Sequence, residues 1–166
     1  RSGVLWLGTF TGGLNKLVPG DHDGARATFV SYQTDPHDSS SVSNNCVLAI
    51  YEDRAGELWM ATAGGGLNKF NRQAETFTRY TEKNGLANNF VYGILEDEQG
   101  NLWLSTNKGL SRFNPPTETF QNYDVRDGVQ SNEFNGGAYD KGSAARGGEM
   151  IFGGINGFNA IFQERI

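Results

Sequence analysis

The sequence predicts an all-β protein: a partial β-propeller of four-stranded antiparallel blades, with two complete and two incomplete blades in the chain. The first observation is a repeated tryptophan, because Trp6, Trp59 and Trp103 share one sequence context and a degenerate copy has Ile151 at the matching position. The second is the spacing of these anchors, 53, 44 and 48 residues, which suits a propeller blade and is too long for leucine-rich or ankyrin repeats. The third is that each copy resolves into short runs of β-branched and aromatic residues.

The third copy shows the strands of one blade most clearly. We expect strands at residues 90–96, 102–106, 110–114 and 119–123. Short loops containing Gly100 and Gly109 join the first three of these strands, and glycine supplies the positive φ that tight hairpins require. No segment has the capping and periodicity of a helix, so we expect no helices.

The copies divide the whole chain, residues 1–166, into four consecutive blades. We expect a partial blade over residues 1–33, complete blades over 43–81 and 87–124, and a second partial blade over 131–166. The first copy is longer because it carries two polar, turn-rich insertions, PGDHDGAR and TDPHDSSS. Since a propeller closes by pairing its first and last blades, we expect the chain to be a fragment of a larger protein or to complete its ring by self-association.

Composition and charge exclude several partners. The formal net charge is −5 with acidic and basic residues interspersed, so the sequence shows no footprint for nucleic acid. No apolar run is long enough to span a membrane, and no signal peptide is present, so we expect no membrane contact by this segment. Cys46 is the single cysteine, which precludes an internal disulfide and favours a role as a small apolar strand residue.

The recurring residues predict structure rather than chemistry. A tryptophan at the same place in every blade is what burial between blades demands, so we expect the tryptophans in the core. Glu52 and Asp53, like Glu96 and Asp97, precede a glycine turn, where we expect each aspartate to accept hydrogen bonds from turn amides. The glycine-rich loops connect strand to strand and lack the helix that a phosphate site needs. We therefore predict no catalytic residue and no cofactor.

A metal site is conceivable only in the insertions of the first copy. His22 and His37 are the only histidines, and Asp35 and Asp38 lie near them in sequence. Their spacing matches no established set of metal ligands. We expect solvated loop residues and no metal.

The candidates for ligand binding lie at the start of the inner strands. They are recurring asparagines and residues that differ from the repeat. Asn44, Asn88 and Asn132 recur and are expected to act as turn caps. In the fourth copy, alignment of residues 132–135 with residues 44–47 makes Glu133 replace an asparagine and Asn135 replace a valine. The innermost strand of a blade borders the central channel, so these groups could face its mouth. The predicted ligand residues are Asn45, Asn89, Glu133 and Asn135. A second departure, DKGSAARGGE at residues 140–149, is expected to be a solvent-exposed hairpin.

The string GLxNNxVxxIxEDxxGxLWxxTxxGLxxF, from Gly85 to Phe113, resembles the two-component regulator propeller repeat, and the tail resembles the last blade of such propellers. The resemblance implies a non-catalytic sensor propeller of seven blades on the periplasmic or extracellular side of a membrane signalling protein. It also implies that an oligosaccharide is a common signal and that the output domains lie across the membrane. The motif assigns no ligand residue.

Two other functions remain open. One is an enzyme of the streptogramin-lyase type, which needs a histidine and acidic residues converging on the channel. The other is a protein-interaction scaffold in the manner of WD repeats, although the Gly-His and Trp-Asp signature of those repeats is absent.

Overall fold

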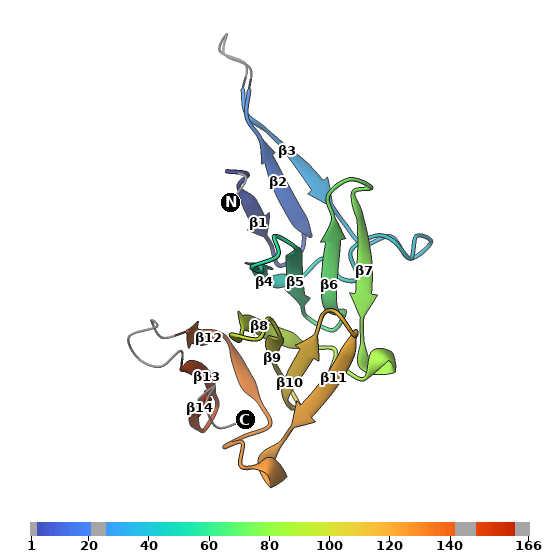
Figure 1. Cartoon of the computed structure of the whole chain (residues 1–166). Coiled ribbons are helices and arrows are strands. Elements are labelled where there is room, and N and C mark those ends of the chain that lie inside the picture. Colours follow the sequence, from blue (N-terminus) through green and yellow to red (C-terminus); the bar gives the residue numbers. More distant parts are fainter. Residues whose placement is uncertain (1–2, 21–25, 142–148, 162–166) are drawn as a thin grey trace.

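Four antiparallel sheets form the protein, arranged as a fan (Figure 1). The computed structural model describes residues 3–20, 26–141 and 149–161. Two sheets have four strands and two have three, each in up-and-down order. The predicted fold class is thereby confirmed. Among the described residues, no helix has the length and apolarity that a membrane crossing requires.

Each sheet corresponds to one copy of the repeat. Blade 1 consists of β1 (Trp6–Gly8), β2 (Leu14–Val18) and β3 (Thr28–Tyr32). Blade 2 consists of β4 (Val47–Glu52), β5 (Leu58–Thr62), β6 (Gly66–Asn71) and β7 (Thr76–Tyr80). Blade 3 consists of β8 (Val91–Glu96), β9 (Leu102–Thr106), β10 (Gly109–Asn114) and β11 (Thr119–Tyr123). Blade 4 consists of β12 (Phe134–Lys141), β13 (Met150–Gly154) and β14 (Gly157–Ile161). The innermost strands β4, β8 and β12 lie side by side on the concave side of the fan.

Two short helices depart from the sequence expectation. The 3-10 helices η1 (Glu82–Asn84) and η2 (Val125–Asp127) follow the outer strands β7 and β11. Thr81 caps η1 and Asp124 caps η2, each within a reciprocal capping box. The prediction of no helices is wrong at these two places, because a single turn of three residues is too short to produce a detectable periodicity.

Aromatic residues fill the seam between neighbouring blades. Trp59, which is 1% exposed, lies with its ring centroid 6.0 Å from that of Tyr80 in its own blade and 5.6 Å from that of Phe113 in blade 3. The same trio between blades 1 and 2 consists of Trp6, Tyr32 and Phe70. The predicted core position of the tryptophans is confirmed for Trp59 and Trp103, whereas Trp6 is half-buried.

A tyrosine–glutamate hydrogen bond closes each of the first two seams. The Tyr32 hydroxyl donates to Glu75 Oε1 at 2.8 Å, and the Tyr80 hydroxyl donates to Glu118 Oε1 at 2.7 Å. Both glutamates lie in the turn after the third strand of the next blade and have a φ of 54°. Among the described residues they are the only non-glycine residues with positive φ, a conformation that costs about 1 kcal/mol. The seam contact therefore accompanies a strained turn in blade 2 and in blade 3.

The face of blade 1 that points away from blade 2 exposes positions that are buried in blade 2. Leu5, Leu7 and Phe29 are 50%, 42% and 52% exposed. The strand registers place Leu58, Met60 and Phe77 at the same positions of blade 2, where they are 2%, 0% and 5% exposed. In blade 2 these side chains are covered by the tryptophan-bearing face of blade 1. Blade 1 thus presents an apolar face that no described residue covers.

We expect the Tyr80–Glu118 bond to contribute roughly 1 kcal/mol to the free energy of unfolding, since one partner is charged but exposed. A double-mutant cycle of Tyr80→Phe and Glu118→Gln, followed by urea unfolding, measures this coupling. Tyr123→Phe is the matched control, because the buried Tyr123 hydroxyl has no hydrogen-bond partner among the described residues and its loss should cost nothing. Zero coupling for the pair would contradict the assignment.

Candidate functional site

At one edge of the fan two sets of loops meet: the connections from an outer strand to the next inner strand, and the hairpins between the second and third strands. We call this edge the connection face. In blade 3 it comprises residues 81–90, 107–108 and 124–133. Because loops on a rigid sheet scaffold tolerate variation, this face is where a binding site is expected.

The repeated aspartates at the opposite edge hold the tryptophans. Asp97 Oδ2 accepts a hydrogen bond from Trp103 Nε1 at 3.1 Å, and its Oδ1 accepts one from the Asn101 amide at 2.8 Å. Arg112 forms an ion pair with the same carboxylate at 3.0 Å. Burial would raise the pKa of Asp97, but the hydrogen bonds from these neighbours outweigh burial and hold the pKa below its ordinary value. Asp53 holds Trp59 in the same way at 2.8 Å. The predicted turn bonds of the aspartates are present, and the bond to tryptophan was not predicted.

Asn45 and Asn89 tie the connections to the inner strands. Asn45 Oδ1 accepts a hydrogen bond from the Thr34 amide, and Asn89 Oδ1 accepts one from the Glu82 amide, both at 2.8 Å. Asn132 Oδ1 accepts one from the Val125 amide at 3.2 Å. These bonds give Asn45 and Asn89 a structural role, and neither residue lines the cavity described below.

The same bonds change the alignment of the fourth copy by one residue. Asn132 is equivalent to Asn45 and Asn89, rather than to Asn44 and Asn88. Glu133 therefore stands where the earlier copies have Cys46 and Phe90, and Asn135 stands where they have Leu48 and Tyr92. The expectation that Glu133 replaces an asparagine and Asn135 a valine is wrong, because the sequence match was loose and only the hydrogen bonds define the register.

Glu133 and Asn135 are both exposed at the start of β12. Here the ladder to β13 is irregular, because Phe134 pairs with Gly154 while Tyr139 pairs with Phe152. The residues between these positions form a wide bulge on the innermost strand. The predicted hairpin at residues 140–149 begins within β12, and residues 142–148 lie outside the described part of the chain.

The histidines do not form a metal site in the part of the chain that is described. His37 is exposed in a loop where Asp35 Oδ1 accepts a hydrogen bond from its amide at 2.8 Å. No group of three or more metal-ligating side chains gathers among the described residues. His22 lies outside them.

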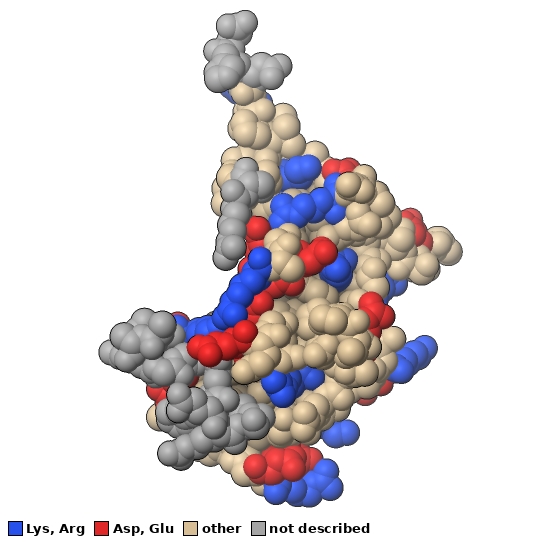
Figure 2. All heavy atoms as spheres, viewed as in Figure 1, with Lys and Arg blue, Asp and Glu red and all other residues tan. Residues whose placement is uncertain are grey.

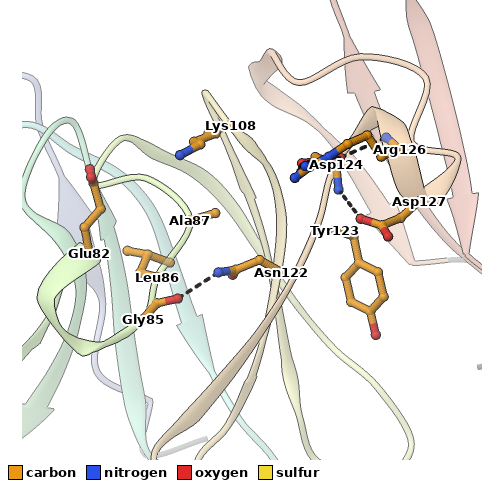
Figure 3. Close-up of a pocket in the computed structure, with 10 residues that line it drawn as sticks. All are labelled: Glu82, Gly85, Leu86, Ala87, Lys108, Asn122, Tyr123, Asp124, Arg126 and Asp127. Atoms are coloured by element: carbon orange, nitrogen blue, oxygen red, sulfur yellow. Dashed lines mark hydrogen bonds and ion pairs between the residues drawn. The ribbon is translucent and has the colours of Figure 1, made fainter.

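A cavity of about 450 Å³ lies on the connection face of blade 3 (Figure 3). Its lining is mainly polar and comprises Glu82, Gly85, Leu86, Ala87, Lys108, Asn122, Tyr123, Asp124, Arg126 and Asp127. The connections around η1 and η2 form opposite walls, and Asn122 of β11 lies between them. Asn122 Nδ2 donates to the carbonyl of Gly85 at 2.8 Å, and Asn122 Oδ1 accepts a hydrogen bond from Ser111 at 2.7 Å.

Arg79 occupies the corresponding space in blade 2. The strand registers pair Asn68 with Arg79 and Ser111 with Asn122, which makes Arg79 the counterpart of Asn122. The Arg79 guanidinium donates to the carbonyls of Ser41 and Asp38, both at 2.9 Å. Blade 2 therefore fills with a long side chain the region that blade 3 leaves open.

Two further differences from blade 2 enlarge the space in blade 3: Ala87 stands in place of Ser43, and Ser111 in place of Asn68. In blade 2, Asn68 donates a hydrogen bond to Ser43 at 2.7 Å. The equivalent contact in blade 3 joins the smaller residues Ala87 and Ser111. A Cβ at Gly65 would lie 2.2 Å from Ser43 Oγ, so the blade 2 hairpin has no room for a side chain. The equivalent hairpin of blade 3 carries Lys108 beside Ala87. The cavity thus results from coordinated departures from the repeat.

The cavity presents charges of both signs. Arg126 pairs with Asp124 at 2.6 Å, and the hydrogen bonds of this pair lower the pKa of Asp124 to about 2. Asp127 accepts a hydrogen bond from the Asp124 amide at 2.9 Å. Among the described residues, no carboxylate forms an ion pair with Lys108. The wall thus offers carboxylate acceptors, amide donors and the Lys108 ammonium, a set that suits a ligand rich in hydroxyl groups.

Comparison with known proteins confirms the resemblance inferred from the sequence. Residues 41–64 and 85–108 match the model of the two component regulator propeller. These segments cover the last part of the connection, the inner strand and the second strand of blades 2 and 3. No curated protein is significantly similar to the chain in sequence.

Solved structures share the fold. The extracellular domain of a putative one component system from B. thetaiotaomicron superposes with a TM-score of 0.76 at 24% identity, over 97% of this chain and 22% of that one. PorZ, a surface component of the type-IX secretion system of Porphyromonas gingivalis, superposes with a TM-score of 0.63 at 18% identity, over 96% and 23%. The extracellular domain of a putative hybrid two component system from B. thetaiotaomicron gives 0.51 at 20% identity, over 99% and 28%. The chain is a propeller segment spanning about a quarter of the length of these structures.

We expect the Asp97 contacts to produce a pH-dependent stability. Because the pKa of Asp97 is lower in the folded state, its contribution is fully present above the unfolded pKa of about 3.9 and is lost as pH falls through the folded value. Asp97→Asn should cost about 2 kcal/mol at pH 7, and the difference from wild type should shrink below about pH 4. Urea unfolding across a pH series measures this, with the exposed Asp140→Asn as control. A difference that does not change with pH would contradict the assignment.

Proposed function

We propose that this chain is a non-catalytic, ligand-sensing propeller segment of a membrane signalling protein, and that its ligand is an extracytoplasmic oligosaccharide. The observation that carries the proposal is the cavity of blade 3, which the repeat does not require and which three departures from the repeat open. A polar recess on a frame devoted to stability is the arrangement of a binding module.

The lining favours a saccharide over other ligands. The carboxylates of Glu82 and Asp127 can accept hydrogen bonds from hydroxyl groups, while Lys108 and Asn122 can donate to hydroxyl and ring oxygens. Charges of both signs are also interspersed over the face of the molecule in Figure 2, which gives no extended basic surface for nucleic acid. The extracellular placement of two of the similar structures supports the same side of the membrane for this chain.

The absence of catalysis is part of the same proposal. The aspartates that recur in the repeat, Asp53 and Asp97, are committed to the tryptophans of their blades. His37 is exposed in the connection between blades 1 and 2, whereas the cavity lies on blade 3. The described residues therefore offer no histidine–carboxylate arrangement of the streptogramin-lyase type, and no observation favours that alternative.

We expect Asn122→Arg to weaken saccharide binding, because it places in blade 3 the side chain that fills the same space in blade 2. Isothermal titration against neutral and acidic oligosaccharides from starch, xylan and pectin should identify a ligand for wild type. Asn122→Arg should then weaken its binding roughly tenfold or more. Gln121→Arg is the matched control, since Gln121 is exposed on the same strand but outside the cavity. Equal binding by wild type and Asn122→Arg would exclude this cavity as the site.

We further propose that a tryptophan-bearing blade of the same repeat covers the apolar face of blade 1. Blade 2 shows what such a face requires, because Trp6 and Tyr32 of blade 1 pack on Phe70 and its neighbours. Blade 4 of a second copy is a poorer occupant. It has Ile151 where other blades have tryptophan, and Ala160 where they have the cation that lies over it. The proposed partner is therefore another blade rather than a second copy of this chain.

Paired alanine substitutions test this covering. In the full-length protein, Leu7→Ala should destabilise by about 2 to 5 kcal/mol, as expected for Met60→Ala at the equivalent buried position. Thermal and urea unfolding of the two variants give the comparison. A cost for Leu7→Ala within about 0.5 kcal/mol would show that the face stays in water.

A further inference from the structure

An aromatic pair lies on the connection face beside the cavity, at the concave edge of blade 3. The rings of Phe90 and Tyr92 have centroids 4.8 Å apart, and both side chains are half-buried. The equivalent residues of blade 2 are Cys46 and Leu48, so the repeat itself does not require rings here. One side of Tyr92 contacts the apolar cluster between blades 3 and 4. The pair is thus a second departure from the repeat on the same blade and the same face.

A two-residue hairpin joins this pair to the cavity. The Tyr92 hydroxyl donates to Asn107 Oδ1 at 2.7 Å, and the next residue, Lys108, lines the cavity. Asn107 and Lys108 are both exposed. In blade 2 the hairpin is Ala63, Gly64 and Gly65, which has no polar side chain. The polar hairpin of blade 3 therefore forms a continuous path from the cavity to the ring of Tyr92.

The bulge of β12 leaves the ring of Tyr92 accessible. A Cβ at Gly136 would lie 3.6 Å from Tyr92 Cδ1, so the strand passes the ring with a residue that has no side chain to cover it. Asn135, Gly136 and Gly137 are exposed and lie between the ladder positions that pair with β13. In blades 2 and 3 the corresponding irregularity leaves one residue between paired positions, from Val47 to Ala49 and from Val91 to Gly93, whereas in β12 four residues lie between Phe134 and Tyr139. The wider bulge therefore brings its main chain at Gly136 beside the ring, with the exposed Asn135 as the preceding residue.

We propose that the sensed saccharide is longer than the cavity and extends over the Asn107–Lys108 hairpin, so that a further sugar ring stacks on Tyr92 between Phe90 and the β12 bulge. An aromatic face carries partial negative charge and attracts the polarised C–H groups of a pyranose, while hydroxyl groups at the ring edge meet polar groups of the bulge. This inference rests on the proposed function and adds a chain-length preference to it. It also gives Asn135, on the bulge, a place beside the ligand.

The test compares short and long members of one oligosaccharide series. For the series that binds wild type, isothermal titration is run from the disaccharide to the hexasaccharide. The longer members should bind wild type roughly tenfold more tightly than the disaccharide. Tyr92→Ala should remove this gain and leave disaccharide binding unchanged. Phe10→Ala is the matched control, because Phe10 is an aromatic residue 79% exposed in the equivalent hairpin of blade 1.

Two more variants separate stacking from a folding defect. Gly136→Leu covers the Tyr92 ring without removing it, and Gly136 has no positive φ that a side chain would strain. It should lose the same chain-length gain as Tyr92→Ala. Tyr92→Phe keeps the ring and should keep the gain.

The outcomes distinguish this inference from the proposed function. A chain-length gain that survives both Tyr92→Ala and Gly136→Leu would overturn the stacking proposal, as would equal affinity for short and long members. In either case the effect of Asn122→Arg on disaccharide binding would still support the cavity. Wild-type protein that binds no member of any series would overturn both.

Discussion

Burial of one blade's tryptophan-bearing face against the next blade is the contact on which the rest of this structure depends. Each sheet is apolar on both faces, so no blade can satisfy its hydrophobic surface alone. Trp59 and Tyr80 meet Phe113 across the seam, and the Asp53 carboxylate holds the indole in one orientation. The order of the blades, the curvature of the fan and the position of every loop follow from repeating this contact.

The seam leaves the loops of the connection face, where we propose that the ligand binds, free to differ between blades. Residues that recur in the repeat are committed to it: Asp97 to Trp103, Glu118 to Tyr80, and Asn89 to the backbone of the connection. The loops between these anchors carry no such requirement. In blade 2 the Arg79 side chain fills the space between these loops and donates a hydrogen bond to the preceding connection. In blade 3 the shorter Asn122 leaves a recess at the same place. A rigid frame with a recess between its loops is a physical basis for binding without loss of stability.

The limits of sequence reasoning are clearest at residues whose partners lie in another blade. The turn bonds of Asp53 and Asp97 were predictable, because their partners are four residues away in the same turn. The bond from Tyr80 to Glu118 spans 38 residues and depends on a glutamate with positive φ, which no local pattern indicates. Asn45 and Asn89 were predicted as ligand residues, whereas the structure uses their side-chain oxygens to hold the connections. The sequence signal for the cavity is that blade 3 has Asn122 where blade 2 has Arg79. This difference is visible in the repeat, but its effect depends on neighbouring residues whose positions the sequence does not give.

The sequence alone determined the repeat, and with it the blade architecture, the strand order and the buried tryptophans. It could do so because a propeller blade is a local unit, whose alternation of apolar residues and glycine turns is read within about 45 residues. Only the tertiary structure decided the register of the fourth blade, the seam bonds, and the meeting of residues 82–87, 108 and 122–127 around one recess. Those features arise where segments distant in sequence approach each other, and distances between such segments depend on how the blades pack together. The repeat therefore specifies the frame, while the places where blades differ become a site only when the frame brings them together.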